Sequence, residues 1–307
     1  MSTTTTTDDP GRLMRLATYA SVATAGTLIV IKLAAWGMTG SVALLSTLID
    51  STLDAAASAV NLWAVRHALT PADHDHRFGH GKAEPLAGLG QAAFILGSGG
   101  VLLAQAVNRL QHPVEVSNAD IGTAVMVVSI LMTIALVRFQ KYVLSRARSV
   151  AISADSLHYT GDVMMNGAVI VSLLAGQFLG WTFIDPLFAI GIGGYLLWNA
   201  WSIARNSMDM LMDRELPEED RIRIRDITLS IPDVRGMHDL RTRLSGQQGF
   251  IQLHLAMDDD LPLVRAHDIA DRVEAAILAA YPYCDVLIHQ DPVSLHEEVP
   301  AFDQPVP

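Results

Sequence analysis

Cysteine is almost missing from this chain of 307 residues, which contains only Cys284. A single cysteine excludes an intramolecular disulfide and any metal cluster held by several thiolates. The chain also has neither an HExxH sequence nor a nucleophile motif. At its start it lacks a basic segment followed by an apolar core. We therefore expect the threonine-rich residues 1–11 to be a disordered tail, not a cleaved signal.

Basic residues are too few in the C-terminal third to balance its acidic residues, which accounts for the net charge of −11. Residues 1–207 hold 12 acidic and 12 basic residues, whereas residues 208–307 hold 20 acidic and 9 basic. This shift predicts a membrane domain over 12–207, a second domain over 208–293 and a tail over 294–307. An acidic domain argues against nucleic acid as a partner and suits cations.

Long apolar stretches dominate the first domain, since half of the chain is hydrophobic and its mean hydropathy is +0.31. Six of them are long enough to cross a bilayer as helices: 13–36, 42–65, 83–107, 121–137, 150–179 and 184–203. The sequence therefore predicts an α-helical membrane protein with six transmembrane helices in a lipid bilayer.

Most basic residues of this domain lie in, or next to, one set of connections, whereas Lys32 lies inside the first apolar stretch. That set contains Arg12, Arg15, Arg66, Arg77, Lys82, Arg138, Lys141, Arg146, Arg148 and Arg205, and the opposite set contains only Arg109. An even number of spans puts both termini on one side, and positive residues mark the cytoplasmic side. Both termini are therefore expected in the cytoplasm.

Two apolar stretches each carry a pair of ionisable residues at helical spacing. Asp50 and Asp54 are four residues apart, and so are His158 and Asp162. A carboxylate at membrane depth costs roughly 2.5–3.5 kcal/mol on insertion scales, so each pair needs a bound partner. One such pair alone could be a helix cap or a polar contact between helices. Two matched pairs favour a divalent transition-metal site, with zinc preferred for a tetrahedral set.

Two further clusters hold residues that commonly bind metals. The loop PADHDHRFGHGKAEPL contains Asp73, His74, Asp75, His76 and His80, although short histidine tracts in solvated loops also bind metals incidentally. After residue 208 the pattern predicts the order α-β-β-α-β, with helices on one face of a sheet. This α+β domain contains His238, His254, His267, His289 and Asp291. Any one of these histidines alone is typical of a surface residue, but together they predict a second metal site.

Four motif regions occur in order along the chain: KLAAWGMTGSVALLSTLIDSTLDAAAS, PADHDHRFGHGKAEPLA, HYTGD, and HDLRTR with VLIHQDP. With these motifs the chain resembles the cation diffusion facilitator family, and within it the bacterial zinc and ferrous-iron efflux branch. The resemblance covers residues 12–293. It implies a homodimeric antiporter of the bacterial inner membrane, with a cytoplasmic metallochaperone-like domain, that exchanges Zn²⁺, or Fe²⁺, Cd²⁺ or Co²⁺, for protons.

The resemblance also implies a role for each candidate residue. Asp50, Asp54, His158 and Asp162 correspond to the transport site, and Asp73, His76 and His80 to the loop site. His238, His254, His267, His289 and Asp291 correspond to a binuclear cytoplasmic site. Lys82 and Asp213 correspond to a charge interlock near the membrane surface. His74 and Asp75 depart from the closest pattern of the family.

Two other functions fit part of the sequence. A membrane-embedded metallohydrolase would use a bound metal to activate water, but it needs an open coordination position and a separate acid or base. A metal sensor without transport would explain the acidic domain, but it does not require ligands at membrane depth.

Overall fold

The computed structural model describes residues 9–40, 42–111, 120–179 and 184–294. The chain divides into two compact units, Met1–Met208 and Asp209–Pro307. Most of the expected tails, 1–8 and 295–307, lies outside the described residues, as do parts of two expected connections, 112–119 and 180–183.

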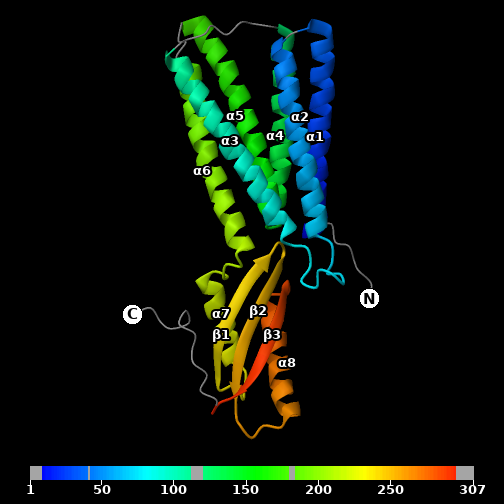
Figure 1. The fold of residues 1–307 in the computed structure, drawn as a ribbon, viewed down its shortest axis with the longest axis vertical. Helices are drawn as coiled ribbons and strands as arrows, with labels where there is room; N and C mark the ends of the chain where they lie inside the picture. The colour runs from blue at the N-terminus through cyan, green and yellow to red at the C-terminus, as the bar shows by residue number, and fades with distance from the viewer. Residues whose placement is uncertain (1–8, 41, 112–119, 180–183, 295–307) are drawn as a thin grey trace. The chain divides into compact units, whose positions relative to one another are not determined.

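Long helices form the N-terminal unit (Figure 1). Within the described residues they are α1 (Pro10–Thr39), α2 (Val42–Ala68), α3 (Ala83–Gln111), α4 (Asp120–Leu144), α5 (Val150–Leu179) and α6 (Ile184–Leu211). In the part of the chain that the structure describes, four segments are long and apolar enough on their own to cross a membrane: Pro10–Thr39, Ala83–Asn108, Ala124–Leu144 and Pro186–Leu211. The two helices outside that group, α2 and α5, carry the two pairs of ionisable residues.

The ends of α1 follow from its sequence. Asp9 caps the first turn, where its side chain accepts a hydrogen bond from the backbone N–H of Gly11 at 3.1 Å, and Pro10 occupies the first helical position. Gly40 ends the helix in the left-handed conformation, with φ of 62°. The helix therefore begins inside the expected tail of residues 1–11.

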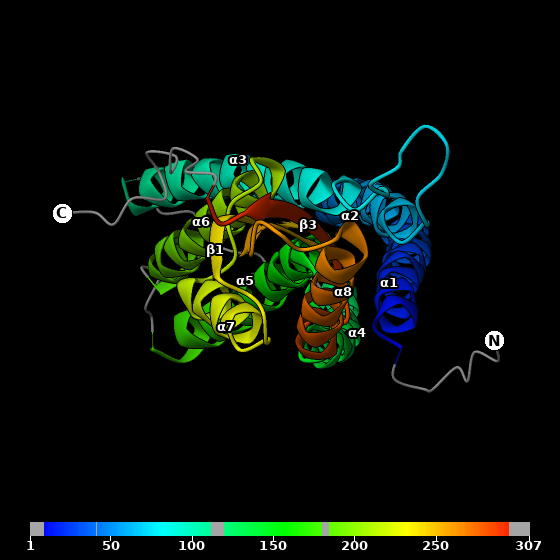
Figure 2. The same cartoon turned by 90° about the horizontal axis from the view of Figure 1, so that it is seen from below.

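Two apolar clusters hold the helices together. One contains buried residues of α3, α5 and α6, including Ile95, Leu157 and Leu196. The other joins α1, α2, α4 and α5 around residues such as Met14, Val65 and Ile152. Helix α5 takes part in both clusters and lies between α6 and α4 (Figures 1 and 2). It is therefore the central helix of this unit.

The expected connection after residue 137 is shorter in the structure, because α4 continues to Leu144. The physical reason is apolar packing: Val143 is fully buried, and Phe139 and Leu144 pack against the same cluster. The basic residues of this segment thus lie partly on helix α4. Likewise, α6 continues to Leu211, four residues beyond position 207, where the charge pattern had predicted the end of the membrane domain.

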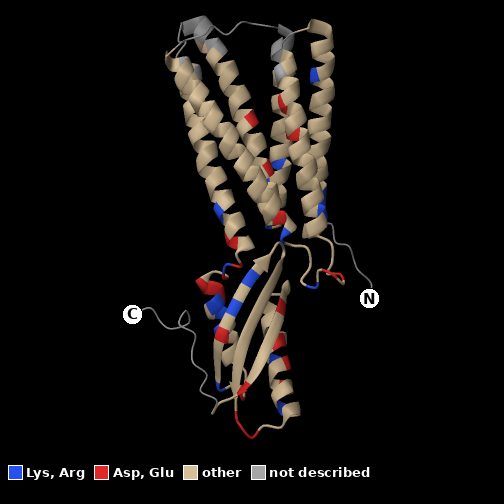
Figure 3. Ribbon diagram, viewed as in Figure 1, with Lys and Arg blue, Asp and Glu red and all other residues tan. Residues whose placement is uncertain are grey.

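The C-terminal unit has the order α7 (Glu218–Leu229), β1 (Gly236–Ser245), β2 (Gln248–Met257), α8 (Leu263–Ala280) and β3 (Cys284–Pro292). The strands form one sheet in the order β1-β2-β3, with β1 antiparallel and β3 parallel to β2. Its core joins Ile224 of α7, Ile269 and Ile277 of α8, and Leu253 and Leu255 of β2. The predicted α-β-β-α-β order is confirmed, and Figure 3 shows how frequent charged residues are in this unit.

Candidate metal sites

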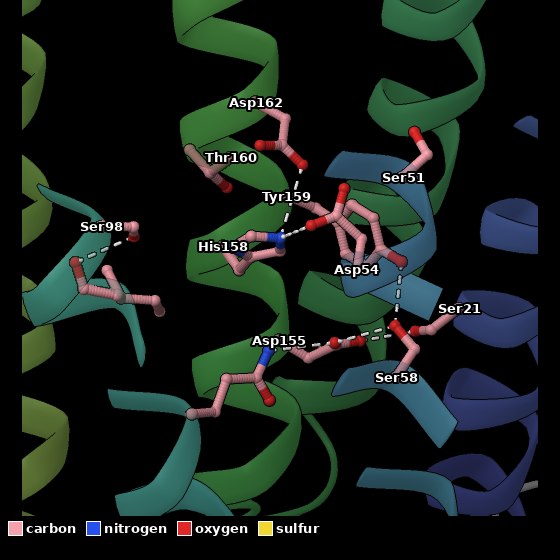
Figure 4. A network of polar contacts seen from close by, with 12 residues as sticks. Ser21, Ser51, Asp54, Ser58, Ser98, Asp155, His158, Tyr159, Thr160 and Asp162 are labelled. Atoms are coloured by element: carbon pink, nitrogen blue, oxygen red, sulfur yellow. Dashed lines mark hydrogen bonds and ion pairs between the residues drawn. The ribbon is translucent and has the colours of Figure 1, made fainter. Parts of the chain in front are cut away.

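The pairs predicted on two helices meet in the structure. The Nε2 atom of His158 on α5 lies 2.8 Å from an Asp54 carboxylate oxygen on α2 and 3.7 Å from an Asp162 carboxylate oxygen on its own helix (Figure 4). Each of the three residues offers one ligand atom, and these atoms lie within 4.8 Å of one another. They can therefore converge on one cation after small side-chain rotations.

Asp50 is not a member of this group of three, but it lines the same space. One cavity of about 320 Å³ is lined by Asp50, Asp54, His158 and Asp162 together with residues of α3 and α6. A second cavity of about 210 Å³ is lined by Asp50, Asp54 and Asp162 together with residues of α1 and α4. The three carboxylates thus border two cavities.

Asp155 lies one turn before His158 and is almost fully buried, at 1% exposure. Side chains from four other helices donate hydrogen bonds to its carboxylate: Ser21 at 2.6 Å and Ser58 at 3.4 Å (Figure 4), and also Gln91 at 3.2 Å and Gln140 at 2.7 Å. Ser58 also lies 2.9 Å from the Tyr159 hydroxyl. These contacts give Asp155 a structural role, because they join four other helices to α5.

The loop between α2 and α3 brings together Asp73, His76 and His80. Their ligand atoms lie within 4.8 Å of one another. Asp73 accepts hydrogen bonds from the backbone N–H groups of Asp75 at 3.0 Å and His76 at 2.7 Å, which holds the pKa of its carboxyl below the usual value. A carboxylate that stays ionised is ready to bind a cation.

The orientation of His80 is set by Thr70. The Thr70 hydroxyl donates to the His67 carbonyl at 2.6 Å and lies 3.0 Å from His80 Nδ1. Because the Thr70 hydroxyl hydrogen is already used in the bond to the His67 carbonyl, His80 Nδ1 carries a hydrogen and donates it to the Thr70 oxygen. The lone pair of His80 is then on Nε2, which lies 3.3 Å from the Asp73 carboxylate. By contrast, His74 and Asp75 have highly exposed side chains that contact each other at 3.4 Å.

Strand register builds the third cluster. His254 on β2 is the register partner of His238 on β1 and of His289 on β3. The Asp291 carboxylate, only 4% exposed, lies 2.9 Å from His254, 3.5 Å from His238 and 3.1 Å from His289. Three imidazoles around one buried carboxylate provide nitrogen and oxygen ligands suited to a transition metal.

The fourth predicted histidine of this domain lies elsewhere. His267 is on α8, which packs against the face of the sheet that carries Leu253 and Leu255. Successive residues of a strand face opposite sides, so His254 is on the other face. The His267 ring lies 3.6 Å from Asp271 on the same helix. Within one chain, the structure does not bring His267 to the other three histidines.

The predicted interlock would join the two units. Asp213, with φ of 56°, lies 3.3 Å from Arg243 within the C-terminal unit. Lys82 belongs to the N-terminal unit, just before α3. The pairing of Lys82 with Asp213 stays a prediction.

Some polar residues near these sites were not predicted from the sequence. Asp239 has φ of 48° beside a strand irregularity, and its carboxylate lies 3.6 Å from His254 Nε2. Glu84 on α3 is 2% exposed and accepts hydrogen bonds from the Ser149 hydroxyl and from the first N–H groups of α5. Glu84 lies in the first turn of α3, where a glutamate is expected to interact with the N-terminus of its own helix. The sequence around it does not indicate that it binds the N-terminus of α5 instead.

Two family comparisons cover most of the chain. Residues 18–212 match the cation efflux transmembrane domain, and residues 216–293 match the cation efflux protein cytoplasmic domain. The chain therefore belongs to the cation efflux family. Its members are transporters, which excludes the metallohydrolase alternative and confirms the resemblance drawn from the sequence motifs.

Individual relatives are similar over nearly their full length. The cation-efflux pump FieF of Klebsiella pneumoniae is 49% identical over 294 residues, which cover 96% of this chain and 97% of that protein. FieF of Salmonella agona is 48% identical over 285 residues, covering 93% and 95%. A solved structure of the zinc transporter CzrB in its Zn form is 32% identical, covers 28% of this chain and 99% of that chain, and has a TM-score of 0.27.

Proposed function

We propose that this chain exports a divalent metal cation from the bacterial cytoplasm in exchange for protons. The observation that carries the proposal is the contact of Asp54, His158 and Asp162 across two helices of a transporter unit. Asp50, one turn from Asp54 and bordering both cavities, is the proposed fourth ligand. Mixed nitrogen and oxygen ligands favour Zn²⁺ over Mg²⁺ or Mn²⁺, and Fe²⁺, Cd²⁺ and Co²⁺ suit the same set.

Ligand chemistry couples the cation to protons. A metal binds deprotonated ligands, so loading the site displaces protons, with His158 as the main donor. Protons that enter from the other side weaken the site and release the metal. The two cavities that border the same carboxylates support access from two sides, as alternating access requires.

We further propose that α1 to α6 all cross the inner membrane, with both termini in the cytoplasm and the domain boundary near residue 208. The protein would act as a homodimer. The position of His267 supports this, because it faces away from the other three histidines of its own chain and could complete their site only in a second chain. The Lys82–Asp213 interlock would stabilise the dimer near the membrane surface.

The loop site and the C-terminal site are proposed to sense metal. Their carboxylates repel those of a second acidic domain, and bound cations screen that repulsion and draw the domains together. This regulatory part would be refuted if a variant with His238→Ala and Asp291→Ala kept native flux and native domain separation at all metal concentrations.

Flux measurements test the transport function. The full chain is reconstituted in liposomes with an imposed pH gradient, and zinc and iron fluxes are recorded for the native protein, Asp54→Ala and His158→Ala. Asp268→Ala removes an exposed carboxylate of α8 and serves as the control. Proton-dependent flux that only the first two variants abolish would establish the antiporter. Tight metal binding without any flux in the native chain would instead favour a sensor.

A further inference from the structure

Lys32 of α1 reaches across to the neighbouring helix. Its ammonium group donates hydrogen bonds to the buried Ser51 hydroxyl at 2.6 Å and to the Thr47 carbonyl at 3.2 Å, both on α2. A lysine in a lipid-facing position would extend its side chain toward the headgroups. Here the charged end is fixed between two helices, so it belongs to the interior of the unit.

The same lysine shares a cavity with the transport carboxylates. The 210 Å³ cavity is lined by Lys32, Asp50, Asp54 and Asp162, with Tyr159 and Ser51 among the other lining residues. Four groups that can carry full charge thus border one small space between helices. At membrane depth an unbalanced charge is expensive, so their sum decides which cation the space can hold.

We propose that Lys32 is a fixed counter-charge of the transport site. This inference rests on the proposed function, because it assigns the charge of the cargo. Three ionised carboxylates carry −3, and Lys32 reduces that to −2, which one divalent cation neutralises. A monovalent ion would leave the pocket at −1 and a trivalent ion at +1. Lys32 does not touch the cargo and is therefore a positioning residue, acting through the carboxylates.

The charge also sets how tightly the cargo is held. A positive group beside the site repels the metal, which limits affinity and allows release. Without the charge of Lys32, the net charge that faces the same cation is more negative by one unit. The metal should then bind more tightly and leave more slowly. A lysine that served only to hold α1 against α2 would give the opposite result, since a loosened site binds metal less well.

The test compares four forms of the full chain: native, Lys32→Met, Lys32→Arg and Lys141→Met. Methionine keeps the length of the lysine side chain without its charge, arginine keeps the charge, and Lys141 is an exposed lysine in the last turn of α4. Zinc affinity is measured by calorimetry in a background with Asp73→Ala and Asp291→Ala, which weakens the other two sites by removing their carboxylates. Zinc flux is measured in liposomes with those two residues intact.

Lys32→Met is expected to lower both the zinc Kd and the KM by roughly tenfold and to lower kcat. Lys32→Arg and Lys141→Met should remain close to the native values. The inference is overturned if Lys32→Met matches Lys141→Met in both measurements, or if Lys32→Met and Lys32→Arg weaken zinc binding equally. If either of these results is found while the native chain binds and transports zinc, only the inference about Lys32 fails and the proposed function stands. Absence of zinc binding and flux in the native chain would overturn both.

Discussion

The Gln140 amide of α4 donates a 2.7 Å hydrogen bond to the carboxylate of Asp155 on α5, and it does so in a place from which solvent is excluded. The same oxygen also accepts from Ser21, and the other oxygen accepts from Ser58 and Gln91. A buried carboxylate with this many donors is satisfied only while four helices keep their positions around α5.

Asp155→Asn should therefore destabilise the helical unit by about 2 kcal/mol or more. Replacing one oxygen by an NH₂ group makes two of the donors face another donor. The measurement is the melting temperature of the full chain in detergent. Ser21→Ala, which removes a single donor, should lower it less. An Asp155→Asn protein as stable as the native one would contradict the structural role of this carboxylate.

Gly249 on β2 lies directly against Cys284 of β3. A Cβ atom at position 249 would lie only 2.5 Å from the Cys284 sulfur. Gly249→Ala should therefore overpack this part of the sheet and cost about 1–3 kcal/mol. The double variant with Cys284→Ala should regain most of that loss, because it removes the contacting sulfur. A double-mutant cycle on thermal unfolding of the full chain measures the coupling, and additive effects would contradict the contact.

The Cys284 thiol should react slowly. Burial, with a smaller contribution from Asp220, raises its pKa to about 11. At pH 8 the thiolate is then roughly two-hundred-fold rarer than for a cysteine of ordinary pKa, and alkylation slows in proportion. Mass spectrometry after iodoacetamide treatment at pH 8 and pH 10 checks this, with the urea-unfolded chain as the reference. Equal rates for the folded and unfolded chain would refute it.

This raised pKa also affects stability. The folded chain holds the Cys284 proton more tightly than the unfolded chain. The protonated thiol therefore makes its full contribution to the free energy of unfolding below pH 8. It is lost as the pH rises toward 11.

Asp73→Asn should separate the fold of the loop from its affinity for metal. An asparagine oxygen can still accept the backbone N–H groups of Asp75 and His76, so the turn should persist. Zinc affinity at the loop should fall at least tenfold, since a charged ligand is lost. Calorimetry in an Asp54→Ala, Asp291→Ala background measures it. Unchanged affinity would show that the loop histidines bind zinc without Asp73.

The pH dependence of native loop binding follows from the same contacts. The pKa of Asp73 lies below its ordinary value, so this carboxylate stays ionised as the pH falls toward 5. Protonation of Asp73 should therefore not limit zinc binding at the loop between pH 7 and pH 5. An Asp73 carboxyl that takes up a proton in this pH range, followed by NMR, would contradict this.

Local patterns predicted most of the architecture. Apolar runs gave the approximate positions of the long helices, and residues four apart predicted that Asp54, His158 and Asp162 meet, because helix geometry fixes which side chains share a face. Because side chains alternate between the two faces of a strand, VLIHQD predicted that His289 and Asp291 share one face. In the structure their side chains lie 3.1 Å apart on β3. These features depend on neighbours in sequence or on one helix facing another.

Other features that depend on which helices pack together were not predicted. Nothing around Lys32 indicates that it reaches Ser51, and nothing around Asp155 indicates donors on four other helices. Composition groups His267 with the other histidines, but it does not reveal on which face of the sheet α8 packs. The extension of α4 to Leu144 likewise depends on burial of Val143 by other helices.

The alignment of His238, His254 and His289 at one level of the sheet has a consequence for folding. Each histidine comes from a different strand, and a slip of one residue in either pairing would turn a ring to the opposite face. Metal binding at the proposed site would therefore report whether three separate segments have found their native alignment. Chains with one such slip would then be expected to lose part of the zinc stoichiometry of the C-terminal domain.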